Sequence, residues 1–100
     1  MSERAYEAVE IAKKSGKLKK GTNEVTKAIE KGQAKLVVIA GDVSPKEITM
    51  HLPMMCKDKG IPCVTVPSKE ELGAAAGLGL GTVAVAITDA GDAKELLKEF

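Results

Sequence analysis

The sequence predicts an α/β fold, a three-layer α/β/α sandwich with a small mixed sheet of about four strands. Short apolar runs rich in β-branched residues alternate along the chain with segments of helical periodicity. Strands that alternate with helices favour a sheet covered by helices on both faces. At 100 residues and 44% hydrophobic content, the chain suffices for one compact domain with its own core. We therefore expect residues 1–100 to form a single domain.

Two helices and a short edge strand are expected in the N-terminal third. Apolar residues recur at helical spacing over residues 3–15, where Ser15-Gly16 suits a helix that ends in a left-handed glycine. Residues 18–20 would add an edge strand, which allows mixed strand directions. Gly21-Thr22 can cap a second, short helix that Lys31-Gly32 closes. The core side of this second helix is expected to comprise Val25, Ala28, Ile29 and Gly32.

Longer apolar runs predict the remaining strands. Residues 35–40 read Lys-Leu-Val-Val-Ile-Ala and precede Gly41-Asp42. Because the run is continuous rather than alternating, this strand should be buried on both faces in the middle of the sheet. The runs at residues 61–66 and 82–88 predict two further strands.

Capping patterns mark the helices that follow these strands. Ser44-Pro45-Lys46-Glu47 and Ser68-Lys69-Glu70-Glu71 are capping boxes, and they begin helices that run towards Gly60 and Gly77. Asp92-Ala93-Lys94-Glu95 repeats the pattern and starts the last helix. A helix is therefore expected after each apolar strand.

Positive charge is concentrated near the N-terminus. Residues 1–35 carry nine Lys or Arg against five Asp or Glu, whereas residues 36–100 carry six against nine, which gives the net charge of +1. Eight lysines and only two acids lie between Lys13 and Lys35. Such a stretch can neutralise phosphates, although a solvated lysine-rich surface is the alternative.

The chain is expected to work in the reducing cytoplasm and away from membranes. No apolar leader precedes Cys56 and Cys63, because the N-terminal end is charged from Glu3 onward. The longest apolar runs, such as residues 36–40 and 83–87, are far shorter than the ~20 residues that a membrane span needs.

Reactive residues are few and poorly spaced for an enzyme. His51 is the only histidine, and no acid or nucleophile has a recognisable spacing to it, so we expect a structural or surface histidine. A structural zinc site needs four ligands, whereas Cys56, Cys63 and His51 supply at most three. We therefore assign no catalytic residue, no metal and no cofactor.

A glycine-rich loop offers an alternative function. Residues 77–81 read Gly-Leu-Gly-Leu-Gly, but they leave a helix and enter a strand, the reverse of a dinucleotide-binding loop. A flexible connection is the expected role, and its apolar Leu78 and Leu80 are placed to pack onto a partner. Asp42 follows a buried strand, where turning the chain is its expected role. The alternative is a small nucleotide-binding or enzymatic domain that uses Asp42 and this loop.

The second helix carries the most informative polar face. At about 100° per residue, Asn23, Glu24, Lys27 and Lys31 fall on one side, opposite the apolar residues. An amide, a carboxylate and an ammonium within one turn can match base edges, while Lys31 meets phosphates. Since a carboxylate repels phosphate, Glu24 suits an RNA surface only as an acceptor for a base. An ordinary capped amphipathic helix fits the pattern equally well.

In these residues and their order, the chain resembles the L-seven-Ae/L-thirty-e superfamily of kink-turn RNA-binding proteins, and its archaeal members in particular. The likeness extends from about Tyr6 to Leu97. Its most specific block is residues 19–32, Lys-Lys-Gly-Thr-Asn-Glu-Val-Thr-Lys-Ala-Ile-Glu-Lys-Gly. The segments at residues 36–40, 50–53 and 72–91 add order and spacing.

The resemblance implies an RNA site. In such proteins the start of the second helix recognises tandem sheared G·A pairs in a kink-turn, a sharply bent internal loop. Asn23, Glu24 and Lys27 would contact the guanines, with Gly21 and Thr22 allowing close backbone approach. The glycine-rich loop would cover a nucleotide flipped out of the stack. The RNA-binding residues so expected are Lys20, Gly21, Thr22, Asn23, Glu24, Lys27, Lys31, Ile48, Lys69, Leu78, Gly79 and Leu80.

The resemblance also implies binding partners, and the chain differs from the family's usual sequence in two places. The expected RNAs are ribosomal RNA, box C/D and H/ACA guide RNAs and ribonuclease P RNA, together with other ribonucleoprotein proteins; the free protein would be a monomer. Many relatives carry Val-Ser-Arg-Pro in the loop where this chain has residues 78–81, so an arginine-phosphate contact is missing. The chain also starts at its first helix and stops early, which we expect to affect larger assemblies more than kink-turn binding.

Overall fold

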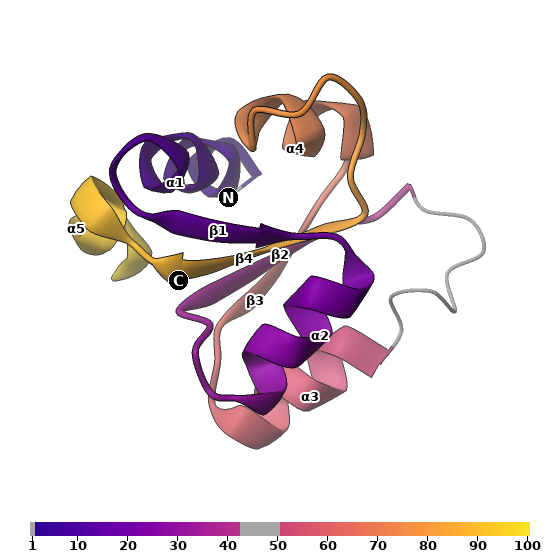
Figure 1. Ribbon diagram of the computed structural model, residues 1–100, viewed down its shortest axis with the longest axis vertical. Coiled ribbons are helices and arrows are strands. Elements are labelled where there is room, and N and C mark those ends of the chain that lie inside the picture. The colour runs from indigo at the N-terminus through magenta and orange to yellow at the C-terminus, as the bar shows by residue number, and fades with distance from the viewer. Residues whose placement is uncertain (1, 43–50) are drawn as a thin grey trace.

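A four-stranded mixed sheet organises the protein, and helices cover both of its faces (Figure 1). The computed structural model describes residues 2–42 and 51–100. The elements in chain order are α1 (Ser2–Ser15), β1 (Lys17–Lys20), α2 (Thr22–Glu30), β2 (Leu36–Ala40), α3 (His51–Lys59), β3 (Cys63–Val66), α4 (Lys69–Ala75), β4 (Ala84–Asp89), the 3₁₀ turn η2 (Gly91–Ala93) and α5 (Lys94–Leu97).

The sheet has the strand order β1-β4-β2-β3. β2 pairs parallel with β3 and antiparallel with β4, while β1 lies antiparallel to β4 at one edge. The mixed sheet and the short edge strand are therefore confirmed. β2 has a neighbour on each side, and all five of its residues are buried, as its unbroken apolar run predicts.

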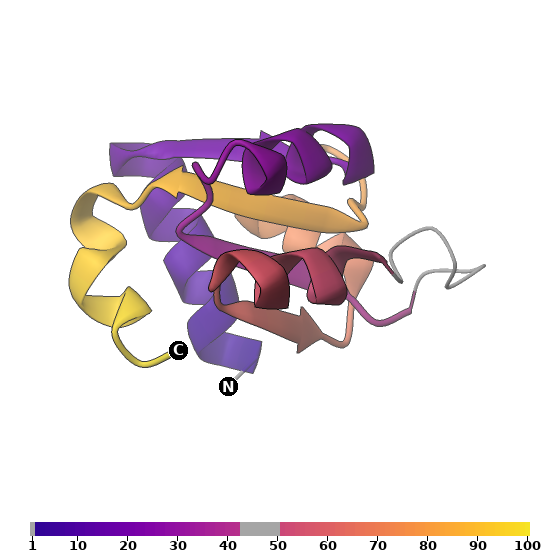
Figure 2. The same cartoon turned by 90° about the horizontal axis from the view of Figure 1, so that it is seen from below.

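Alternate residues of β2 point into two separate cores. Leu36, Val38 and Ala40 pack beneath α1, α4 and α5. Val37 and Ile39 pack on the opposite face, against the apolar sides of α2 and α3. Seen from below, the helices lie in layers on the two sides of the sheet (Figure 2). The predicted three-layer sandwich is confirmed, because successive residues of a strand point to opposite faces.

Some predicted boundaries differ from the structure. β3 begins at Cys63 rather than at residue 61, because Pro62 has no N–H to donate to the ladder, although its carbonyl accepts from the Val37 N–H at 3.0 Å. β4 begins at Ala84 rather than at residue 82. The capping box at residues 44–47 lies outside the described residues. Gly32 is exposed beyond the end of α2 and does not belong to its core side.

The predicted cap at Asp92 is wrong. Within the described chain, the N-cap of α5 is Ala93, preceded by the η2 turn, and no side chain caps either element. Instead, the Asp92 N–H donates to Ser15 Oγ at 2.8 Å, and Asp89 Oδ1 accepts from the Gly91 N–H at 3.1 Å. The end of β4 packs against the end of α1, so tertiary contacts supply the acceptors there.

One hydrogen bond of the capping box predicted at the start of α4 is present, and Tyr6 forms further hydrogen bonds there that the sequence did not predict. Ser68 Oγ accepts from the Glu71 N–H at 3.2 Å. The Ser68 N–H donates to the Tyr6 hydroxyl at 3.2 Å, and that hydroxyl donates to the Ser68 carbonyl at 3.3 Å. Tyr6 therefore ties α1 to the start of α4, and partial burial raises the pKa of its phenol above the ordinary value.

None of the helices within residues 2–42 and 51–100 has the length and apolar character that a bilayer span requires.

Replacing Tyr6 by Phe removes both of these hydrogen bonds and keeps the ring. We expect Tyr6→Phe to lower the free energy of unfolding by about 0.5 to 1 kcal/mol, measured by urea unfolding at pH 7. Because the folded-state pKa of Tyr6 is raised, its contribution is present below the unfolded pKa and lost as pH rises through the folded pKa. The difference between the two proteins should therefore shrink above pH ~10. A difference that grows with pH would contradict this account.

Candidate nucleic-acid interface

One side of α2 is polar and exposed, and its opposite side is apolar and buried. Val25, Ala28 and Ile29 are buried against the sheet, with 0–3% of their surface exposed. Asn23, Glu24, Lys27 and Lys31 are all exposed on the other side. The predicted separation of faces is confirmed, and the buried side holds the polar side in a fixed orientation.

The start of α2 has no side-chain cap within the described residues. Its N-cap residue is Gly21, at φ +91° and ψ 155°, a conformation that L-residues with a Cβ rarely adopt. The Gly21 N–H donates to the Ala84 carbonyl at 2.9 Å, and the Gly21 carbonyl accepts from the Val25 N–H at 3.0 Å. The first N–H groups of a helix have no partner inside it, so the start of α2 is suited to an external acceptor. Gly21 therefore supplies backbone geometry here, while Thr22 is the first helical residue.

A hollow of about 120 Å³ lies beside the polar side of α2. Its lining combines cations with one carboxylate and one amide; it consists of Lys19, Glu24, Lys27, Ala28, Lys31 and Gln33. Among the described residues, the ion pairs involve Arg4 and Lys98, and Glu24 forms none. The Glu24 carboxylate is thus available as an acceptor among lysines that attract phosphates.

Thr26 links α2 to α3 beside this surface. Thr26 Oγ1 donates to the Thr22 carbonyl at 2.7 Å and lies 3.1 Å from His51 Nε2. A threonine hydroxyl has one proton, so when it is donated to the Thr22 carbonyl the oxygen accepts from the ring in its Nε2–H tautomer. His51 is exposed and holds two helices together, in agreement with the expected structural or surface histidine.

The loop between α4 and β4 forms a second surface. Leu80 is 77% exposed, and the loop borders a hollow of about 370 Å³ that Glu70 and Ala74 complete. Leu78, in contrast, is only partly exposed and packs against the core beneath α1 and α4. Leu78 thus contacts the core and also lines this hollow, whereas Leu80 is the more exposed of the two leucines.

The same loop is fixed to α4 at both ends and does not have the character of a flexible connection. The Leu78 N–H donates to the Gly73 carbonyl at 2.8 Å, and the Thr82 N–H donates to the Lys69 carbonyl at 3.0 Å. Gly73 permits this approach, because a Cβ at that position would overlap the Leu80 carbonyl oxygen. The sequence signal was the glycine inside an otherwise good helix, which often marks close backbone packing.

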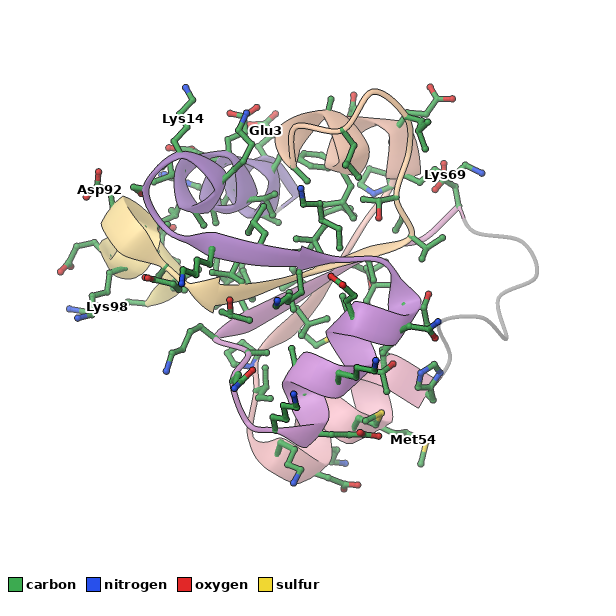
Figure 3. All side chains as sticks on the ribbon, viewed as in Figure 1. Glu3, Lys14, Met54, Lys69, Asp92 and Lys98 are labelled. Atoms are coloured by element: carbon green, nitrogen blue, oxygen red, sulfur yellow. The ribbon has the colours of Figure 1, made fainter. Side chains whose placement is uncertain are left out.

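The two surfaces meet at one end of the sheet. The hydrogen bond from Gly21 to Ala84 places the start of α2 beside the strand that the loop enters, and both lie at the same end of the molecule in Figure 1. Lys69 projects from this end as well (Figure 3). Of the expected site residues, Gly21, Thr22, Lys69 and the loop lie towards this end, while Lys27 and Lys31 follow α2 away from it, and the two hollows share no lining residue. Ile48 lies outside the described residues.

Asp42 is engaged in a structural contact. Its Oδ1 accepts from the Lys69 N–H at 2.9 Å, so it satisfies one of the first N–H groups of α4. Sequence reasoning expected a turn-forming aspartate and missed this contact between distant segments. Within residues 2–42 and 51–100, no group of three or more His, Cys, Asp or Glu is arranged to hold a metal ion.

Both cysteines are thiols whose ionisation is disfavoured by burial. Both are unpaired; Cys56 is buried and Cys63 is partly buried beside it. Burial, followed by the neighbouring Cys56, raises the pKa of the Cys63 thiol to about 12, and burial raises the pKa of Cys56 as well. A thiolate, the form that binds metals and attacks electrophiles, is therefore disfavoured at both positions.

The fold and this surface define a small α/β protein that exposes a polar helix face beside a hollow lined by lysines. The family model described as "Ribosomal protein L7Ae/L30e/S12e/Gadd45 family" matches residues 3–97, and the chain belongs to this family. It is the family that the sequence resembles, so the resemblance is confirmed. Because its members are RNA-binding structural proteins, the prediction that the chain is not an enzyme is also confirmed.

A solved structure supports the same assignment. The "Giardia lamblia 15.5kD RNA binding protein" is similar to this chain, with 35% sequence identity and a TM-score of 0.92. The match covers 98% of this chain and 82% of the other. The predicted fold class thus agrees with the fold of a relative.

Adding a methyl group at Gly73 tests whether the loop depends on close packing against α4. We expect Gly73→Ala to lower the free energy of unfolding by about 1 to 3 kcal/mol, because its Cβ would displace the Leu80 backbone. Gly79→Ala is the matched control, since a Cβ there meets nothing within 4 Å. Equal unfolding midpoints for the two variants would show that the loop is not held in this way.

The raised pKa of Cys63 predicts slow alkylation of the folded protein. At pH 8 the thiolate fraction should be roughly a thousandfold below that of a free cysteine. Modification by iodoacetamide, followed by mass spectrometry, should therefore be slow in buffer, faster at higher pH and rapid in urea. Rapid labelling of native Cys63 at pH 8 would refute the prediction.

Proposed function

We propose that this protein binds and stabilises kink-turn motifs in RNA, as a component of the large ribosomal subunit and of box C/D or H/ACA guide ribonucleoproteins. RNA binding follows from the family, and the structural relative is itself titled an RNA-binding protein. The kink-turn and its tandem sheared G·A pairs are the finer part of the proposal. They rest on the geometry around the start of α2.

The observation that carries the proposal is the position of Glu24. Its carboxylate lies in a hollow with Lys19, Lys27 and Lys31, yet forms no ion pair among the described residues. A surface that bound phosphates alone would gain nothing from a carboxylate, which repels them. A carboxylate accepts hydrogen bonds only, so its natural ligand is an N–H edge such as that of guanine. Glu24 therefore supplies specificity, and the lysines supply affinity.

The loop surface complements this recognition. Leu80 is exposed above the second hollow, at the end of the sheet where α2 begins. An apolar side chain there can lie against the face of a base that has left the stack. Because the loop has no arginine, this contact depends on apolar packing and on close approach at Gly79. The contact between Leu80 and the extruded base would stabilise the kinked RNA without adding a charge interaction.

Binding of this kind selects a shape. The α2 surface and the loop lie on one rigid unit, because hydrogen bonds fix both to β4 or α4. A kinked RNA can present its G·A pairs to α2 and its extruded nucleotide to the loop at the same time. The protein therefore shifts the population of the RNA towards the bent conformer through differential affinity for it.

Replacing Glu24 or Lys27 should weaken binding to a kink-turn. We expect Glu24→Ala to reduce affinity by about 10- to 100-fold, equivalent to about 1–3 kcal/mol for the loss of a base contact, measured by electrophoretic mobility shift. Glu30→Ala is the matched control, because Glu30 is an exposed glutamate of the same helix outside the hollow. Lys14→Ala, which removes an exposed lysine of α1, is the matched control for Lys27→Ala. If these controls weaken binding as much as the site variants, the proposal fails.

The RNA offers an independent control. A duplex in which the tandem G·A pairs are replaced by Watson–Crick pairs keeps its phosphates but loses the kink and the exposed edges. The wild-type protein should bind it far more weakly than the kink-turn. Equal affinity for both RNAs would leave only nonspecific phosphate binding.

A further inference from the structure

A row of adjoining hollows leads away from the α2 surface. The hollow beside α2 shares Lys19 and Gln33 with a second one of about 550 Å³, which also reaches Lys17 and Lys35. The second shares Lys35, Thr88 and Asp89 with a third of about 720 Å³, which extends to α5. Because neighbouring hollows share lining residues, they adjoin one another along the surface, and together they are called here the lysine trough.

The trough is strongly cationic. Its lining includes seven lysines and only two acids. One of these acids, Asp89, uses Oδ1 to accept from the Gly91 N–H and thereby holds the turn after β4. Lys98 has an ion pair with Glu95 at 3.3 Å, but both side chains are more than 70% exposed, so the pair is weak. The lysines of the trough are Lys17, Lys19, Lys27, Lys31, Lys35, Lys94 and Lys98.

These lysines come from distant parts of the chain. Lys17 and Lys19 belong to β1, Lys35 precedes β2, and Lys94 and Lys98 lie in or beside α5. The trough follows the direction of α2, from its start near the loop surface towards its end and on to α5. Figure 2 shows α5 at the opposite end of the molecule from the start of α2. A ligand in the trough therefore extends away from Leu80.

We propose that the lysine trough binds the phosphate backbone of the paired RNA arm that continues from the G·A pairs. This inference rests on the proposed function, and it adds a second, sequence-independent contact to it. The shared lining carries the argument, since Lys19 and Gln33 border both the hollow beside α2 and the next hollow of the trough. Charge also favours a nucleic acid, because regularly spaced phosphates can be neutralised by flexible lysines without a specific sequence.

The test varies the length of that arm. Two kink-turn RNAs share the G·A pairs, and one has a short arm of roughly four base pairs while the other has roughly twelve. The wild-type protein should bind the long-arm RNA more tightly, with a steeper salt dependence. In the triple variant Lys35→Gln, Lys94→Gln and Lys98→Gln, the slope of log affinity against log salt should fall by about three for the long arm. Its affinity for the short-arm RNA should equal that of the wild type, which also verifies folding.

A charge-matched control separates the trough from charge in general. Lys14→Gln, Lys57→Gln and Lys59→Gln removes three exposed lysines outside the hollows and should keep the gain from the long arm. The inference is overturned if this control loses the same gain, or if the wild type gains nothing from the long arm. It is also overturned if the trough variant loses only its binding to polyglutamate, which would indicate an acidic protein partner. Failure of the proposed function appears differently, as equal binding of the short-arm kink-turn and its Watson–Crick counterpart.

Discussion

The burial of β2 on both faces is the constraint on which the rest of the structure depends. All five of its residues are buried, and they point alternately into two cores. Neither core is complete without helices above it, so α1 and α4 must cover one face while α2 and α3 cover the other. At roughly 25 cal/mol per Å² of apolar surface removed from water, this double burial is the dominant favourable term of the fold. This burial also sets the orientation of α2, because Val25, Ala28 and Ile29 leave water only when they pack into the core beneath α2 and α3.

The polar site is a consequence of that packing at the end of the sheet. The hydrogen bond from Gly21 to the Ala84 carbonyl joins the start of α2 to β4, and β4 is entered directly from the loop that carries Leu80. The loop in turn is held on α4, whose first N–H groups are satisfied by Ser68 and Asp42. Hydrogen bonds therefore hold both the start of α2 and the loop in defined positions.

Charge and specificity have different origins in this protein. Lysines are spread over β1, α2 and α5, and exposed cations of this kind supply affinity that depends on salt. Glu24 works against that attraction and is retained within the same hollow. Under the proposed function, the carboxylate would accept from an N–H edge while the cations contact the phosphate backbone. The thiols of Cys56 and Cys63 stay outside it, since burial keeps them protonated.

Sequence alone determined the order of strands and helices, the mixed sheet and the polar side of α2, because hydrophobic periodicity and capping residues are local signals. It also indicated Glu24 as the unusual residue of its helix. Only the tertiary structure decided that Leu78 packs partly against the core, that Asp42 caps α4, and that Ala93 replaces Asp92 as the cap of α5. It also decided that lysines from four separate regions line the trough. These features depend on contacts between residues that are far apart in the chain. A local sequence pattern does not predict which distant segments pack against each other.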